Sequence, residues 1–512
     1  MATLSVLLGL AAGAGPISSG ARAAARAEVT ILAGPPSTLD PALQGDVGSA
    51  GFSAQLFESL TAFDLDLALR PALARSWDVS PDGRRIVFHL RPGLTFSDGS
   101  RLTADDVVGS WLRIVDPRRP SPLASLLLDV HGVADRLGGR SVDPLDVGLR
   151  ADGLDVDVEL DRPGADFPAI VSSAIFGIVP RQVWGGNADI DAGAVASSGA
   201  YAIKLVTDTE FTLAANERYW AGTPAIATVH LRSDIGGRSP VAAFQDGDVD
   251  YAPISSSDAS WIRYDDVLGP DLRLVPSLSL TYVGFTSRPP FDDVRVRQAF
   301  ARVVDWRRVT VLGSPGDTVP ADSTVPPGVP GGGDQDWLPK LDPVGARRLL
   351  AEAGFPGGAG FPIVTFAAGG IGPAEGIAED LRRELGVAVH LEELDDHVGR
   401  LVDDPPAMWS MAWVADYPGA NDFLGVLLGT DSSNNYGRWS SPGFDAAIND
   451  ALATRDPGAA LAAYERALAI VRDEAPVVPI AYGDGWALSR GGLLGAGSNG
   501  LGVLRLAGLA WE

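Results

Sequence analysis

One stretch of the chain, residues 408–445, brings a carboxylate and several aromatic rings close together in sequence. Trp409, Met411 and Trp413 alternate with other residues, and this period of two predicts a strand over 409–414. The strand stops at a run of residues typical of a turn, namely Asp416, Tyr417, Pro418 and Gly419. We therefore treat this strand end as a candidate ligand site. The alternative is a buried strand followed by a solvated turn that binds nothing.

The elements that must position this turn precede it in a regular order. The sequence predicts a strand over 361–366, a helix over 373–385, a strand over 387–391, a short helix over 395–401 and the strand over 409–414. Within the first helix, apolar residues recur at helical spacing. Alternating strands and helices are typical of a parallel, doubly wound sheet. Because ligands bind beyond the carboxyl ends of such strands, this order places Asp416 at the binding edge.

Several kinds of chemistry are excluded or disfavoured by composition. The chain has no Cys, so thiol catalysis, disulfides and Cys-ligated metal sites are excluded. The spacing of His390 and His397 fits no metal motif, and we expect neither a metal nor a cofactor. The glycine-rich run 495–500 matches dinucleotide-site spacing, but only twelve residues follow it, too few for the required fold. Adjacent acid pairs such as Asp403 and Asp404 leave a secreted hydrolase as an alternative, although no acid/base pair stands out.

Length and charge set further bounds. A chain of 512 residues is too long for one ordinary core, so two or three domains are expected. The composition, 46% hydrophobic and 21% charged, is that of a globular protein. The formal net charge is -25 and no run of Lys or Arg occurs, so nucleic acid is not an expected partner.

The N-terminal residues predict a secretory signal peptide. An apolar run from Leu4 to Ala14 is too short to cross a bilayer, and Ala25-Arg26-Ala27 has the spacing of a cleavage site. We therefore expect residues 1–27 to be removed and the mature protein to be soluble in the periplasm or outside the cell. No Lys or Arg precedes Leu4, which departs from the usual pattern. An ordinary apolar N-terminal helix is the alternative.

Many short motifs occur in the order of one known family. They include the segments 76–83, 88–93, 96–99 and 103–107, then 198–201, 216–222, 244–250 and 291–300. In these segments the chain resembles the family 5 extracytoplasmic solute-binding proteins of ABC importers, the oligopeptide, dipeptide and nickel type. One departure is Ala200, where the family often has Pro. The resemblance covers nearly all of the chain after residue 27.

The resemblance implies an α/β, two-lobed periplasmic-binding-protein-like fold of the large type II class, with an additional domain. Lobe one would combine residues 28–56, 178–284 and 479–512. The additional domain would be 57–177, and lobe two 285–478. The crossings near Thr286 and Ile480 would be hinges.

The family also implies a function. The protein would capture di- or oligopeptides as a monomer, without catalytic residues, and deliver them to the membrane subunits of an ABC permease. In peptide-binding relatives, the acid of the Trp-x-x-Asp motif pairs with the amino terminus of the peptide. The matching acid in this chain is Asp416. The expected ligand-binding residues are Asp416, Trp413, Tyr417, Ala415, Trp409 and Asn434. Nickel chelate, haem and oligosaccharide remain alternative cargoes.

Overall fold

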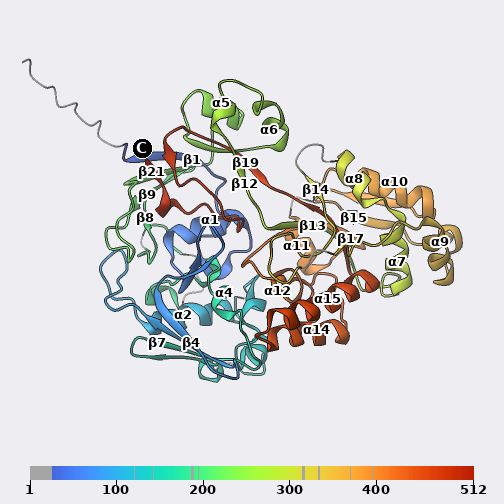
Figure 1. The fold of residues 1–512 in the computed structure, drawn as a ribbon, viewed down its shortest axis with the longest axis horizontal. Helices are drawn as coiled ribbons and strands as arrows, with labels where there is room; N and C mark the ends of the chain where they lie inside the picture. Colours follow the sequence, from blue (N-terminus) through green and yellow to red (C-terminus); the bar gives the residue numbers. More distant parts are fainter. Residues whose placement is uncertain are drawn as a thin grey trace, which may run out of the picture.

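Two large sheets organise the protein (Figure 1). The computed structural model describes residues 26–512 except 120, 142, 186–189, 194, 314–317, 333, 334, 370 and 395. The first sheet has the order β12 (Leu272–Val275), β19 (Gly485–Ser489), β11 (Tyr251–Ile254), β1 (Glu28–Leu32), β10 (Thr228–Arg232), β9 (Glu210–Ala215) and β8 (Tyr201–Val206). The second has the order β14 (Val319–Pro320), β18 (Val477–Tyr482), β13 (Ser279–Phe285), β17 (Met408–Val414), β15 (Val364–Ala367) and β16 (Val389–Glu392). Each sheet forms the centre of one lobe.

In the first lobe, β1 lies inside the sheet and is parallel to both of its neighbours, β10 and β11. Its alternation is simple, since Val29 and Ile31 are buried while Glu28 is exposed. Helix α1 (Val47–Leu56) follows and is capped by Asp46, whose carboxylate accepts from the Ser49 amide at 2.8 Å. Two short helices, α5 (Pro240–Gln245) and α6 (Ser256–Ile262), lie at the top of Figure 1.

The second lobe contains the predicted doubly wound unit. The strands β15, β16 and β17 alternate with α10 (Ala374–Leu385) and α11 (His397–Asp403), and β15 is parallel to both other strands. On α10, Ile377, Leu381 and Leu385 are buried, as their spacing predicts. The prediction of a helix from residue 395 is confirmed from His397, while Asp395 itself lies outside the described residues. Further helices cover this lobe: α7 (Val294–Val303), α8 (Trp306–Gly313), α9 (Pro343–Glu352), α14 (Pro442–Ala453) and α15 (Pro457–Glu474).

A third, antiparallel sheet lies within the range predicted for the additional domain. Its order is β4 (Ala74–Val79), β5 (Arg85–Leu90), β7 (Asp155–Glu159) and β6 (Leu149–Asp152), and α2 (Ala104–Ile114) packs on it. A capping box of Thr103 and Asp106 starts α2. Buried side chains of this domain, such as Trp111, belong to the same apolar cluster as Phe423 and Leu468 of the second lobe. The additional domain and the second lobe are therefore packed against each other.

The crossings between the two large sheets differ from the predicted positions. Strands β13 and β18 pair with each other in the second sheet, so residues 279–284 and 479–482 do not belong to lobe one. The chain changes sheet at 276–278 and again at 483–484, instead of near Thr286 and Ile480. The two crossings touch, because the Ser277 amide donates to Asp484 Oδ1 at 3.1 Å. This correction follows from strand pairing. β13 pairs with β17 and β18 pairs with β13, so both strands belong to the second sheet.

Residues next to the predicted cleavage site contact lobe one. The Arg26 guanidinium pairs with the Asp250 carboxylate through two hydrogen bonds of 2.8 Å and lies over the Trp511 ring. The Ala27 carbonyl accepts from the Ala227 amide at 2.8 Å. Cleavage after Ala27 stays a prediction, and it would remove the Arg26–Asp250 pair. Residues 1–25 lie outside the described residues. Among those that are described, no helix combines the length and hydropathy needed to cross a membrane.

Candidate functional site

Strand β17 positions the predicted site. It pairs along its whole length with β13, and its partner residues run from Phe285 opposite Met408 to Ser279 opposite Val414. Beyond the strand, the Ala415 amide donates to the Leu278 carbonyl at 2.9 Å. Asp416 therefore follows directly after the strand end and beside the first crossing between the lobes.

The Asp416 side chain is half-buried and has little to stabilise its charge. One carboxylate oxygen accepts from Ser173 Oγ of the additional domain at 3.3 Å. Burial raises the pKa of Asp416 to about 7, and the Ser173 hydrogen bond only partly opposes this effect. No cationic side chain among the described residues contributes to its stabilisation.

A second acid, Asp422, lies next to Asp416 and was not predicted. It belongs to α12 (Ala420–Phe423) and is completely buried. Its Oδ2 accepts from the Trp413 indole at 3.0 Å and from the Asp416 amide at 3.1 Å, whereas its Oδ1 has no hydrogen-bond partner. Burial, reinforced by the nearby Asp416 charge, raises the pKa of Asp422 far above its ordinary value. The site thus holds two interacting acids and an unsatisfied acceptor.

Tyr417 points from this turn into the additional domain. Its hydroxyl donates to Asp166 Oδ2 at 3.0 Å and accepts from Asn421 Nδ2 at 3.1 Å. Burial raises the pKa of Asp166 to about 6. Tyr417 is itself 1% exposed, so its ring packs between the second lobe and the additional domain. The structure thus gathers Trp413, Ala415, Asp416 and Tyr417, four of the six predicted residues, around Asp422.

The other two predicted residues, Trp409 and Asn434, lie elsewhere. They line a void of about 10 Å³, which has room for about one water molecule. The Trp409 ring fills the space over Gly284, where a Cβ would lie 2.4 Å from the indole. Asn434 Nδ2 donates to Ser125 Oγ of the additional domain at 3.2 Å. Both side chains are at least nine-tenths buried, and a role in ligand binding stays a prediction.

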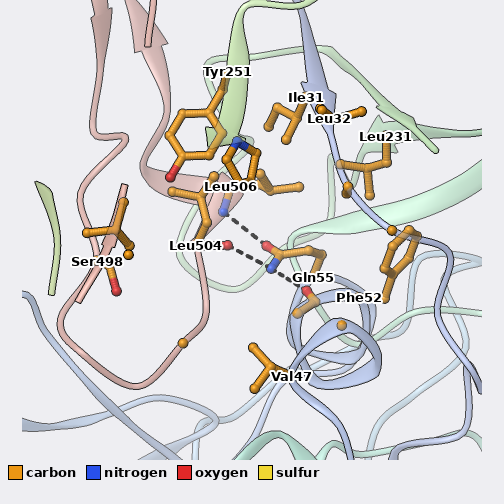
Figure 2. Close-up of a pocket in the computed structure, with 18 of the residues that line it drawn as sticks. Ile31, Leu32, Val47, Phe52, Gln55, Leu231, Tyr251, Ser498, Leu504 and Leu506 are labelled. Carbon is orange, nitrogen blue, oxygen red and sulfur yellow. Dashed lines mark hydrogen bonds between the residues drawn. The ribbon is translucent and has the colours of Figure 1, made fainter. Parts of the chain in front are cut away.

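A larger cavity lies in lobe one, and the sequence interpretation missed it (Figure 2). Its volume is about 320 Å³. It is bounded by the end of β1, by α1, by the crossing strands at Val275 and Gly485, and by the C-terminal loop 498–506. Gln55 braces one wall, where its side chain exchanges hydrogen bonds of 3.0 Å with the Leu504 carbonyl and the Leu506 amide. These segments are far apart in sequence, and no local pattern marks them.

The acids do not form a metal site. Within the part of the chain that the structure describes, no group of three or more His, Cys, Asp or Glu side chains has the arrangement to hold a metal ion. The chemistry that the Asp416–Asp422 pair does offer is acceptance: it can take hydrogen bonds and positive charge from a cationic group.

Comparison with known proteins identifies the family. Residues 68–435 match the model of the bacterial extracellular solute-binding proteins, family 5. The chain belongs to this family. It is 29% identical to the probable deoxycholate-binding periplasmic protein of Escherichia coli K12, over 87% of this chain and 86% of that protein. It is 28% identical to the periplasmic oligopeptide-binding protein of Salmonella typhimurium LT2, over 87% of this chain and 85% of that one.

Solved structures share the fold. The murein tripeptide-binding protein of Escherichia coli superposes with a TM-score of 0.84, at 24% identity, over 95% of this chain and 99% of that chain. The unliganded open form of that protein gives 0.71, over 95% and 98%. The two-lobed α/β architecture with an additional domain is thereby confirmed.

Proposed function

We propose that this protein is the solute-binding subunit of an ABC importer, and that outside the cytoplasm it captures peptides with a free amino terminus as a monomer. The observation that carries the proposal is the Asp416–Asp422 pair, which lies where the second lobe meets the additional domain and has no cationic partner among the described residues. Family membership and the peptide-binding names of several relatives support it.

The chemistry of the pair matches an ammonium group. A carboxylate removed from water is stabilised when a charged hydrogen-bond donor replaces the solvent. A peptide amino terminus brings such donors, and Asp422 Oδ1 is a buried acceptor without one. Asp416 makes a single side-chain hydrogen bond, to Ser173, and so keeps acceptor capacity.

Strand β17 also offers backbone groups to a peptide. Its neighbour β15 pairs only with Met408 and Trp409, so no described strand covers that edge from Met411 to Val414. A ligand in extended conformation would add to this edge by main-chain hydrogen bonds, which bind peptides without regard to side chain. Its amino terminus would then lie at the strand end, beside Asp416.

Contacts from both sides of the site suggest how binding would be signalled. Asp416 and Tyr417 of the second lobe bond to Ser173 and Asp166 of the additional domain. A ligand held between these parts favours the closed arrangement by population shift. The closed form would then dock on the permease and release the peptide there.

The test removes the charge of Asp416 and, separately, that of the ligand. Asp416→Asn should weaken binding of trialanine by about 2–5 kcal/mol, the usual cost of breaking a buried charge pair. N-acetyl-trialanine should bind wild type poorly, and the substitution should affect it much less. Calorimetry on both proteins and both peptides completes the cycle.

The matched control is Asp431→Asn. Asp431 is an exposed acid in the same lobe, and its side chain makes no hydrogen bond or ion pair with any residue that the structure describes. This variant should bind trialanine like wild type. Equal losses for the free and acetylated peptides in Asp416→Asn would show that Asp416 supports the turn instead of the ligand, and would overturn the proposal.

A further inference from the structure

The cavity of lobe one has an uncharged lining. Its walls are aliphatic and aromatic for the most part, and no Asp, Glu, Lys, Arg or His is among them. The Gln55 side chain is already satisfied by backbone groups. Ionised ligand groups would lose their hydration in such a space without compensation, whereas apolar groups would gain by leaving water.

Two polar atoms in the lining lack partners. The Tyr251 hydroxyl makes no hydrogen bond with any described residue, and burial raises its pKa to about 12, so it is neutral. The Trp486 indole nitrogen is buried without an acceptor. Each of these groups can donate one hydrogen bond to a carbonyl or hydroxyl. The lining thus combines a large apolar wall with a few donors, the usual composition of a small-molecule site.

Glycines leave the cavity open. A Cβ on Gly51, in α1, would meet no atom within 4 Å, and the same is true of Gly34 at the end of β1. Glycine inside a helix is unfavourable relative to alanine, so its effect at position 51 is to keep space. A volume of about 320 Å³ is at the lower end of the range for ligand pockets, and cavities of about 150 Å³ lined by apolar residues already bind benzene.

The cavity lies near the proposed ammonium site. Gly502 forms part of its wall, and a Cβ there would lie 3.2 Å from Val414 Cγ1. Val414 precedes Asp416 by two residues, about 7 Å of extended chain. The wall at Gly502 therefore lies at most about 13 Å from the Asp416 backbone, a separation that three to four residues of extended peptide would span.

We propose that this cavity binds an uncharged apolar group of the captured ligand. If the ligand is a peptide bound through Asp416, an inference that rests on the proposed function, the group is an apolar side chain about three residues from the amino terminus. The ligand would then be selected by two features at a fixed separation, an ammonium and an apolar group.

The first experiment tests the cavity without a peptide. N-phenylnaphthylamine is uncharged and fluoresces more strongly in apolar surroundings, so titration should show one saturable site on wild type. Gly51→Ala should keep this site, Gly51→Leu should weaken it by at least about tenfold, and Gly51→Phe should abolish it. Gly443→Leu is the control, because Gly443 is an exposed helix residue of the second lobe with room for a side chain. Dye emission unaffected by Gly51→Leu and Gly51→Phe would overturn the proposal.

The second experiment connects the cavity to the ligand. Tetra-alanine is compared with peptides that carry Phe or Asp at each of its positions. Phe at the third position should bind at least about tenfold better than Ala, and Asp there should bind worse. Gly51→Leu should remove the preference for Phe. A preference for Phe that survives Gly51→Leu at every position would contradict the inference.

The two experiments separate the two proposals. Dye binding that depends on Gly51 but not on Asp416, with no peptide bound, would leave the cavity standing and remove the peptide function. Peptide binding that depends on Asp416, without any response to Gly51, would do the reverse.

Discussion

At the scale of single residues, the unusual feature is that two acids share one turn and have no cationic partner among the described residues. Asp422 is held by the Trp413 indole and the Asp416 amide, so its position is fixed even when no ligand is bound. The nearby Asp416 charge disfavours ionisation of Asp422, and burial disfavours ionisation of both acids. This pair of carboxyls therefore keeps a proton more readily than a solvated carboxyl does, and a ligand cation would replace that proton.

This exchange predicts a pH dependence with a definite sign. The pKa of Asp416 is about 7 in the folded protein against 3.8 for a free carboxyl, so the folded state binds the proton more tightly. Its contribution to the free energy of unfolding is therefore largest at low pH and falls as pH rises from about 4 through about 7. The melting temperature of wild type minus that of Asp416→Asn should be higher at about pH 5 than at about pH 8.

Ligand binding should follow the opposite trend, because an ammonium pairs with the ionised acid. Affinity for trialanine should rise over the same pH window, and isothermal titration at several pH values measures it. A melting difference and an affinity that are both independent of pH would contradict the raised pKa.

The two acids also show what sequence can reveal about a site. Asp416 was predicted because it follows an alternating run directly and begins a turn. Asp422 was missed because it lies six residues further on, in a short helix whose residues carry no periodic signal. Its role depends on the turn folding back so that Oδ2 reaches the Asp416 amide, a contact that spacing alone does not predict.

At the scale of elements, α1 contains a residue type that disfavours helix formation. Gly51 lies inside the helix with open space around it. Gly51→Ala should therefore raise the free energy of unfolding by about 0.5–1 kcal/mol, because alanine favours the helix and restricts the unfolded chain. Urea unfolding of the two proteins measures this difference.

A glycine in another setting provides the contrast. Gly83, in the turn between β4 and β5, has a φ of 71°, where a side chain is strained, so Gly83→Ala should destabilise the protein. A loss of stability in Gly51→Ala as well would show that the space beside α1 is not free.

The elements of the second lobe were the most predictable part. In residues 361–414, apolar residues recur with a period near two in the strands and near 3.6 in α10. The alternating order of these strands and helices implies parallel pairing. The placement of β13 was less accessible. Its apolar run from Ser279 to Phe285 indicates a buried strand, but nothing in it specifies which sheet it joins. Pairing with β17 and β18 places β13 in the second sheet. The crossings between the sheets therefore differ from the predicted positions.

At the scale of the whole molecule, the two crossings lie side by side, and we expect the lobes to move about them. Ligand should shift the population toward the closed arrangement. Small-angle scattering with saturating trialanine should show a smaller radius of gyration than without it. The melting temperature should also rise, by the equivalent of roughly 2.7 kcal/mol at 100 times Kd. A scattering profile unchanged at saturation would argue against closure.

The lobe-one cavity shows the limit of prediction at this scale. Its lining comes from β1, α1, β11, the crossing strands and the loop 498–506. Each segment is ordinary by itself: an alternating strand, a helix with glycines, a loop. Only the sheet order, in which β1 lies two strands from β19, brings the first and last parts of the chain together.

That sheet order has a consequence for synthesis. β11 pairs with β19, and Tyr251 lies opposite Ser489. The Glu28 carbonyl accepts a hydrogen bond from the Trp511 indole. Neither contact can form before residues 489 and 511 have been synthesised. The first lobe therefore cannot complete its sheet while the ribosome is still extending the chain. Long-range pairings of this kind close slowly. For the export that we propose, this delay would keep lobe one unfolded for longer, in the state that a secretion channel requires.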